Sequence, residues 1–209
     1  MTQQPKINYQ LMLDETLRKI TAENLRPRLL LHSCCAPCSS YVLEYLTQYF
    51  DITVFYYNPN ISPESEYLYR VAEVKRLIAE FCPSVHFLEG RYEPERFYRM
   101  AKGLENAPER GERCIRCYRM RLEESAAAAQ KGGFDYFTTT LSISPQKDSG
   151  ALNAIGKDTS QQYGIPYLFS DFKKRGGYKR SIELSTQFHL YRQNFCGCVF
   201  SKQQRQAST

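Results

Sequence analysis

Short apolar runs alternate with helical patterns along this chain, and this alternation is what most constrains its fold. Five runs have the length and the apolar, β-branched or aromatic content of strands, at residues 28–32, 51–57, 84–88, 136–141 and 166–172. Apolar residues at helical spacing occupy the segments before and between them and after the last, at residues 9–25, 39–50, 63–81, 94–106, 114–130, 149–163 and 179–195. Strands joined by helical crossovers pair in parallel. The pattern therefore predicts an α/β fold with a mainly parallel, five-stranded sheet and helices on both faces.

Two consecutive helices are predicted where one crossover would be enough, so the segment 91–131 is expected to be a helical insertion near the functional site. A chain of 209 residues suits a single domain, which we place at residues 1–200. The polar tail, 201–209, is expected to be disordered. The segment from Met1 to Asn8 has no apolar signal core, and no run approaches the roughly 18 apolar residues of a membrane span, so we expect a cytoplasmic protein without a membrane partner.

Seven of the eight cysteines fall in three tight groups, with the spacings CC-x2-C, C-x2-C and C-x-C. In a cytoplasmic protein such groups indicate metal binding or redox catalysis rather than structural disulfides. The lone Cys82 is expected to pack in the core. The grouped cysteines are Cys34, Cys35 and Cys38; Cys114 and Cys117; and Cys196 and Cys198.

The first group lies in the stretch LLLHSCCAPC, where a predicted strand runs into a predicted helix. Open α/β sheets bind their ligands at this kind of position, beyond the carboxyl ends of the strands. The same stretch contains C-x-P-C, the arrangement of a thioredoxin-like redox motif. A thiol–disulfide oxidoreductase that uses Cys35 and Cys38 is therefore one alternative function.

The other two groups could bind metal as well. Cys114 and Cys117 are three residues apart near a helix amino terminus, so they share one face, and the helix dipole and nearby arginines favour their thiolates. Cys196 and Cys198 could clamp a metal or form a strained, easily reduced disulfide. Seven thiolates exceed the four of one structural zinc or one four-iron cluster. We therefore expect two metal centres, or one centre beside redox-active thiols; a zinc-stabilised RNA-binding module is the remaining alternative.

Six motifs together resemble the QueH type of epoxyqueuosine reductase, from about Leu29 to Cys198. The resemblance implies a Rossmann-like fold and reductive removal of the epoxide oxygen of epoxyqueuosine, in the anticodon loop of tRNA, to give queuosine. It also implies an electron donor protein or another reductant as a partner. The motifs are LLLHSCCAPC, FYYNPNISPESEY, GERCIRCYRMRLEESA, FTTTLSISPQKD, DFKKRGGYKRSIELS and YRQNFCGC.

The resemblance further implies a 4Fe-4S cluster with an adjacent mononuclear iron. Its cluster ligands would be Cys34, Cys35, Cys114 and Cys117. Cys196 and Cys198 would hold the second iron, or form a redox-active disulfide when the iron is absent. Some relatives have Asp where this chain has Cys38, so Cys38 is expected at the second iron, and Asp148 or Asp171 could supply an oxygen ligand instead.

The implied reaction needs two electrons, two protons and polarisation of the carbon–oxygen bond. Candidate proton donors are Lys147, Asp148, Asp171 and Tyr178. The net charge of +6 permits an RNA partner without demonstrating one. A basic cluster after the fifth predicted strand is either a solvated loop or a tRNA contact, and it contains Lys173, Lys174, Arg175, Lys179 and Arg180. The three histidines, His32, His86 and His189, show no ligand spacing and are expected to be structural or surface residues.

Overall fold

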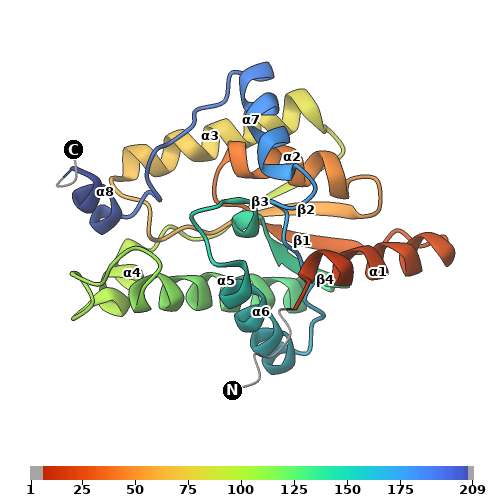
Figure 1. The fold of residues 1–209 in the computed structure, drawn as a ribbon, viewed down its shortest axis with the longest axis horizontal. Coiled ribbons are helices and arrows are strands. Elements are labelled where there is room, and N and C mark those ends of the chain that lie inside the picture. The colour runs from red at the N-terminus through yellow and green to blue at the C-terminus, as the bar shows by residue number, and fades with distance from the viewer. Residues whose placement is uncertain (1–6, 207–209) are drawn as a thin grey trace.

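The computed structural model describes residues 7–206 and contains a parallel sheet of four strands in the order β3-β2-β1-β4 (Figure 1). In the register of the sheet, Leu30 of β1 lies opposite Thr53 of β2 and Phe137 of β4. The predicted α/β class and parallel pairing are confirmed. The strands are β1 (Arg28–His32), β2 (Asp51–Tyr56), β3 (His86–Glu89) and β4 (Tyr136–Thr139).

The predicted fifth strand was wrong, because the segment 166–172 meets the sheet only at an isolated parallel pairing of Tyr167 with Phe137. Beyond Tyr167, the side chain of Asn153 forms the hydrogen bonds to the backbone that a neighbouring strand would otherwise form. Ser170 N donates to Asn153 Oδ1 at 3.0 Å, and Asn153 Nδ2 donates to Ser170 O at 2.8 Å. Polar side chains that bond to backbone groups compete with ladder formation in this way.

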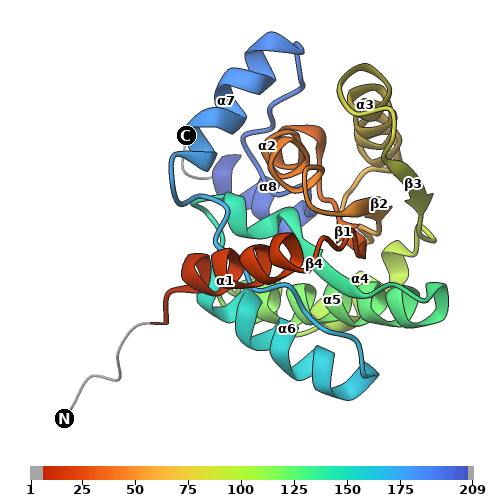
Figure 2. The same cartoon turned by 90° about the vertical axis from the view of Figure 1, so that its right-hand side faces the viewer.

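Helices cover both faces of the sheet, as predicted (Figures 1 and 2). Leu29 and Leu31 enter the core on one face, and Leu30 enters the core on the other. Successive strand side chains alternate between faces, so a strand buried on both faces is a continuous apolar run. The first face carries α1 (Tyr9–Ala22), α2 (Ala36–Leu46) and α3 (Glu64–Phe81), with α7 (Gly177–Gln187) beside α2; the second carries α5 (Glu112–Gly132) and α6 (Ser149–Tyr163).

The predicted helical insertion consists of α4 (Pro94–Ala101) and the loop that joins it to α5. The helix α5 itself is the crossover, since it packs against β4 and α6. A third apolar cluster joins Phe97 of α4 to Met120 of α5 and to Cys198, which directly precedes α8 (Val199–Gln206). Segments far apart in the sequence therefore meet beside the functional site.

Two predictions about the carboxyl-terminal region were wrong. The last predicted helix ends at Gln187 rather than at residue 195, because His189 takes a positive φ of 49° and Leu190 N bonds back to Ser185 O. The segment 188–198 that follows, which we call the strap, contains no helix or strand. The tail predicted as disordered is helical in α8 through Gln206, and residues 207–209 lie outside the described residues. None of the helices within residues 7–206 is long and apolar enough to cross a membrane.

Candidate metal and redox site

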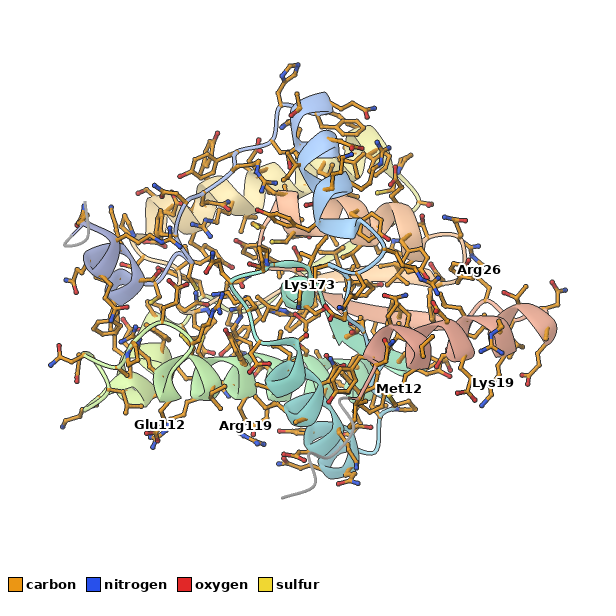
Figure 3. All side chains as sticks on the ribbon, in the orientation of Figure 1. Met12, Lys19, Arg26, Glu112, Arg119 and Lys173 are labelled. Carbon is orange, nitrogen blue, oxygen red and sulfur yellow. The ribbon has the colours of Figure 1, made fainter. Side chains whose placement is uncertain are left out.

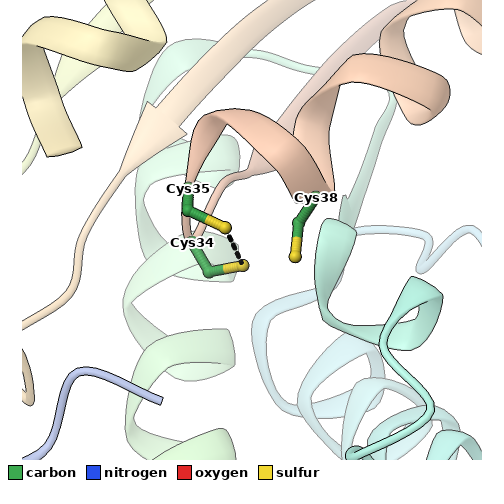
Figure 4. Close-up of side chains that lie close together, drawn as sticks. All are labelled: Cys34, Cys35 and Cys38. Atoms are coloured by element: carbon green, nitrogen blue, oxygen red, sulfur yellow. Dashed lines mark hydrogen bonds between the residues drawn. The ribbon is translucent and has the colours of Figure 1, made fainter. Parts of the chain in front are cut away.

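The first cysteine group sits where β1 ends and α2 begins. Cys35 occupies the N-cap position of α2 with an extended backbone. The sulfur atoms of Cys34, Cys35 and Cys38 all lie within 4.8 Å of one another, and those of Cys34 and Cys35 are 3.7 Å apart (Figure 4). Within residues 7–206, no other set of three metal-ligating side chains is as close. A helix amino terminus favours negative charge, so this position suits thiolates.

The pKa values of the three thiols are shifted in opposite directions. Hydrogen bonds from Cys35 and Cys38, together with the charge of Arg121, hold the pKa of Cys34 well below its ordinary value. The same hydrogen bonds act in reverse on the donors: they raise the pKa of Cys35 to about 12 and that of Cys38 well above its ordinary value. Cys34 is therefore the thiol of this group that favours the thiolate, and the three sulfur atoms are a donor set for a soft metal.

The second group lies in the first two turns of α5. Arg110 N donates to Cys114 Sγ at 3.3 Å. Burial raises the pKa of Cys114, and it raises that of Cys117 to about 11. Figure 3 shows Glu112 and Arg119 on the outer side of α5, whereas Cys117 is buried on the inner side. The predicted shared face of the cysteine pair is thus turned toward the protein interior.

The third group is carried by the strap. Gly197 O accepts a hydrogen bond from Ser62 N at 3.0 Å, which ties the strap to the segment before α3. Burial raises the pKa of Cys198 to about 12. Burial also acts to raise the pKa of Cys196, but the charges of Lys147 and Arg121 outweigh it and lower that pKa. Cys196 is therefore the second cysteine of the site that favours the thiolate.

A cavity of about 170 Å³ brings the first and third groups together. Its sulfur-bearing wall is formed by Cys34, Cys35, Cys38 and Cys196, whereas Cys114, Cys117 and Cys198 are not among the lining residues. Among the described residues, Glu109 is the one carboxylate that lines the cavity. The cationic side chains in the lining are Arg70, Lys147, Arg121, Arg192 and Arg205.

The four candidate proton donors are placed very differently. Lys147 lines the cavity and is buried, and its Nζ has no hydrogen-bond partner within residues 7–206, although Glu109 lies 3.7 Å away. Tyr178 also lines the cavity. Asp148 instead caps α6, accepting from Gly150 N at 2.8 Å, and Asp171 pairs with the Lys173 ammonium at 2.8 Å. Neither aspartate lines the cavity, and both already have structural partners.

The predicted basic cluster is largely neutralised by neighbouring carboxylates. Lys173 pairs with Asp171, and Arg175 and Arg180 form ion pairs with Asp14 and Glu44 respectively. In the part of the chain that the structure describes, Lys174 and Lys179 form no ion pair. A role for this cluster in tRNA binding remains a prediction.

Sequence reasoning missed Arg121, which is buried at the centre of the site. Its guanidinium donates to His32 Nε2 at 3.3 Å and to Asn58 Oδ1 at 2.5 Å. The signal was available in the spacing: Arg121 follows Cys114 and Cys117 at intervals that keep all three on one helical face. His32 is buried and structural, as predicted, because its other nitrogen pairs with Thr139 Oγ1 at 2.8 Å. The lone Cys82, at the carboxyl end of α3, is buried in the apolar core on the first face of the sheet, also as predicted.

Acidification is expected to destabilise the fold through His32. Burial and the neighbouring Arg121 lower the pKa of His32 to about 3. The unfolded chain binds this proton near pH 6.5 but the native state does not, so the stabilisation is present above pH 6.5 and is lost as the pH falls. Urea unfolding at pH 6.5 and pH 5 should show a loss of about 2 kcal/mol from this residue.

The matched controls for this prediction are His32→Gln and His86→Gln. The His32 variant should lose that part of the pH dependence, whereas the exposed His86 should leave it unchanged. An unaltered pH dependence in His32→Gln would contradict the assignment.

Comparisons with known proteins identify the family of this chain. The model of the family described as Epoxyqueuosine reductase QueH matches residues 29–204. The chain is 46% identical to the Epoxyqueuosine reductase QueH of Staphylococcus epidermidis, over 94% of this chain and 85% of that protein. It is 44% identical to the protein of the same name from Streptococcus pyogenes, over 96% and 80%, and 38% identical to that of Thermotoga maritima, over 84% and 91%. The chain therefore belongs to the epoxyqueuosine reductase QueH family.

Proposed function

We propose that this chain reduces epoxyqueuosine in the anticodon loop of tRNA to queuosine, in the cytoplasm and on a Rossmann-like fold. The observation that carries the proposal is the cavity that joins Cys34, Cys35 and Cys38 to Cys196. It offers soft electron-rich ligands beside buried cations, as the two-electron reduction of a carbon–oxygen bond requires. The names of the relatives support the same substrate. The strand order, which reverses beside β1 where the first cysteines lie, supports the fold.

We further propose that a 4Fe-4S cluster is held by Cys34, Cys35, Cys114 and Cys117. An adjacent iron would be held by Cys196, Cys198 and Cys38. The donor set fits these groups, because all eight cysteines are free, Cys34, Cys35 and Cys38 lie within 4.8 Å of one another, and one cysteine of each group acts electrostatically on Arg121. When bound, such centres supply electrons one at a time and polarise an epoxide oxygen.

The residues of the chain handle the proton and the oxygen. Removing the epoxide oxygen breaks both of its carbon bonds, consumes two electrons from the external reductant and two protons, and releases water. Lys147 is favoured as the group that meets this oxygen, because its Nζ is buried in the cavity wall and, within residues 7–206, has an ion pair with Glu109 but no hydrogen bond. Although burial opposes its charge, Cys196, Tyr118 and Glu109 raise the pKa of Lys147, so it enters the reaction as an ammonium.

The nucleoside would enter past Tyr178 and Arg192, which also line the cavity. The Arg192 guanidinium lies 6.0 Å from the centre of the Tyr178 ring, and the two come from α7 and the strap. Aromatic rings and guanidinium planes are the usual stacking partners of bases splayed out of single-stranded RNA. The wobble base is in a single-stranded loop, so extruding it costs little.

The thioredoxin-like alternative has weaker support. In a C-x-x-C redox motif the attacking cysteine has a lowered pKa. Here the pKa values of Cys35 and Cys38 are both raised, and the lowered one belongs to Cys34, which is outside that motif. No specific contact favours the zinc-stabilised RNA-binding module.

Nucleoside mass spectrometry of tRNA tests the proposed function. Cells that lack this gene, and have no other enzyme for the step, should accumulate epoxyqueuosine, and the wild-type gene should restore queuosine. Iron and sulfide analysis of anaerobically purified protein tests the proposed centres. Unchanged queuosine in the deletion strain would refute the function, and a single zinc per chain after reconstitution would refute the centres.

A further inference from the structure

Arg121 is a buried cation without a carboxylate partner. Its side chain is 2% exposed, and its hydrogen-bond acceptors, Asn58 Oδ1 and His32 Nε2, are both neutral. No carboxylate lies within 4.0 Å of its guanidinium anywhere in residues 7–206. By contrast, the buried Arg70 pairs with Glu66 at 2.7 Å. Burying an unpaired charge is costly, so something in the site must compensate for it.

The ionisable groups that act on Arg121 are cysteine thiols, which oppose its charge when they are thiolates. Its electrostatic partners are Cys117, Cys34 and Cys196, one from each cysteine group. Arg121 lies one helical turn after Cys117, while His32 is the last residue of β1 and Asn58 lies two residues beyond the end of β2. Asn58 also donates to Ser33 O at 2.8 Å, next to Cys34 in the chain. One guanidinium thus connects the helix that carries Cys117 to the loop that carries Cys34.

We infer that Arg121 is the counter-charge of an anionic sulfur centre built from all three cysteine groups, and that it is a positioning residue for that centre. The inference rests on the proposed metal centres. Binding a metal ion or cluster converts the remaining thiols to thiolates, which increases the negative charge that faces the guanidinium. Adding an electron increases this charge again, so Arg121 should stabilise the reduced form and raise the reduction potential.

Arg121→Met and Arg121→Lys, with Arg113→Met as the matched control, test this inference. Arg113 is equally buried on α5 and its charge also acts on Cys114 and Cys198, but its guanidinium is held by the carbonyl oxygens of Leu104 and Glu105. In reconstituted protein, the chelator concentration that removes half of the iron should fall about 10- to 100-fold in Arg121→Met, as is typical when a group that contacts metal ligands is lost. The Lys variant keeps the charge and should retain most of the iron.

Two further measurements distinguish an electrostatic role of Arg121 from a purely structural one. The reduction potential should become more negative in Arg121→Met and change less in Arg121→Lys. The melting temperature of the metal-free protein should fall less in Arg121→Met than that of the loaded protein. Arg113→Met should lower both melting temperatures alike. Equal losses in both forms of Arg121→Met, or failure of its metal-free form to fold, would overturn the inference.

Zinc binding to the metal-free protein, measured by competition with a chromophoric chelator, tests the same coupling without a cluster or tRNA. We expect affinity to fall about 10- to 100-fold in Arg121→Met and little in Arg113→Met. If zinc affinity depends on Arg121 but the wild-type protein leaves epoxyqueuosine intact, the proposed function is refuted and the inference is supported. If the wild-type protein reduces epoxyqueuosine but Arg121→Met binds zinc and iron as tightly as the wild type, the proposed function is supported and the inference is refuted.

Discussion

Cys196→Ser is expected to stop the reduction of epoxyqueuosine while leaving most of the iron–sulfur absorbance. Cys196 lines the cavity, and its thiolate is favoured by Lys147 and Arg121. The proposed cluster ligands belong to the other two groups. The Cys196→Ser substitution should therefore remove a ligand of the adjacent iron and leave the cluster in place. Turnover is measured by mass spectrometry of the tRNA nucleosides, and the cluster by its visible absorbance under anaerobic conditions.

The matched control is Cys82→Ser, which removes a buried core cysteine at the carboxyl end of α3 that does not line the cavity. It should keep turnover and lose stability, because a hydroxyl replaces a thiol in an apolar site. If Cys196→Ser loses its absorbance together with its activity, the proposed division of ligands is wrong. Full turnover in Cys196→Ser would remove this residue from the reaction altogether.

Lys147→Met is expected to lower kcat about 10²- to 10⁴-fold, the usual contribution of a positioned proton donor. Methionine is similar in length but carries no proton, and the apolar part of Lys147 already packs in the cavity wall. KM should change little if Lys147 acts on the epoxide oxygen rather than on the tRNA. Single-turnover kinetics with a saturating anticodon stem-loop separate the two effects.

Lys147→Arg and Lys157→Met complete this experiment. The arginine keeps the charge but moves it, so it should recover only part of the rate. Lys157 is exposed on α6, and its loss should leave kcat unchanged. A raised KM with normal kcat in Lys147→Met would assign Lys147 to binding and leave Tyr178 as the remaining proton donor in the cavity.

The periodic elements were the part of the fold that local sequence predicted well. Leu29, Leu30 and Leu31 form a continuous apolar run, which is typical of a strand buried on both faces, and β1 is such a strand. The prediction of a fifth strand was wrong because a buried segment whose backbone is hydrogen-bonded by a side chain has the same apolar pattern as a strand. Asn153 reaches Ser170 from a different helix, and nothing in the local sequence announces that contact.

The predicted helix ends were wrong for a related reason. Apolar spacing continues past Gln187, but the positive φ of His189 stops α7 and releases the strap. The polar sequence after Cys198 resembles a disordered tail, yet Phe200 packs beside Phe97 and Cys198 in an apolar cluster that does not exist until the chain folds. Helix formation in short segments depends mainly on such tertiary packing.

For the site, the sequence by itself determined which residues carry the chemistry: seven grouped cysteines, with family motifs around them. The tertiary structure decided how they are arranged. It brought Cys196 to the cavity wall beside the first group, gave the lowered pKa to Cys34, and moved Asp148 and Asp171 to structural roles. It also placed the unpaired charge of Arg121 among sulfur atoms from three distant segments. Spacing records local geometry alone, whereas electrostatic interactions depend on distances through space, and those are set only when the chain folds.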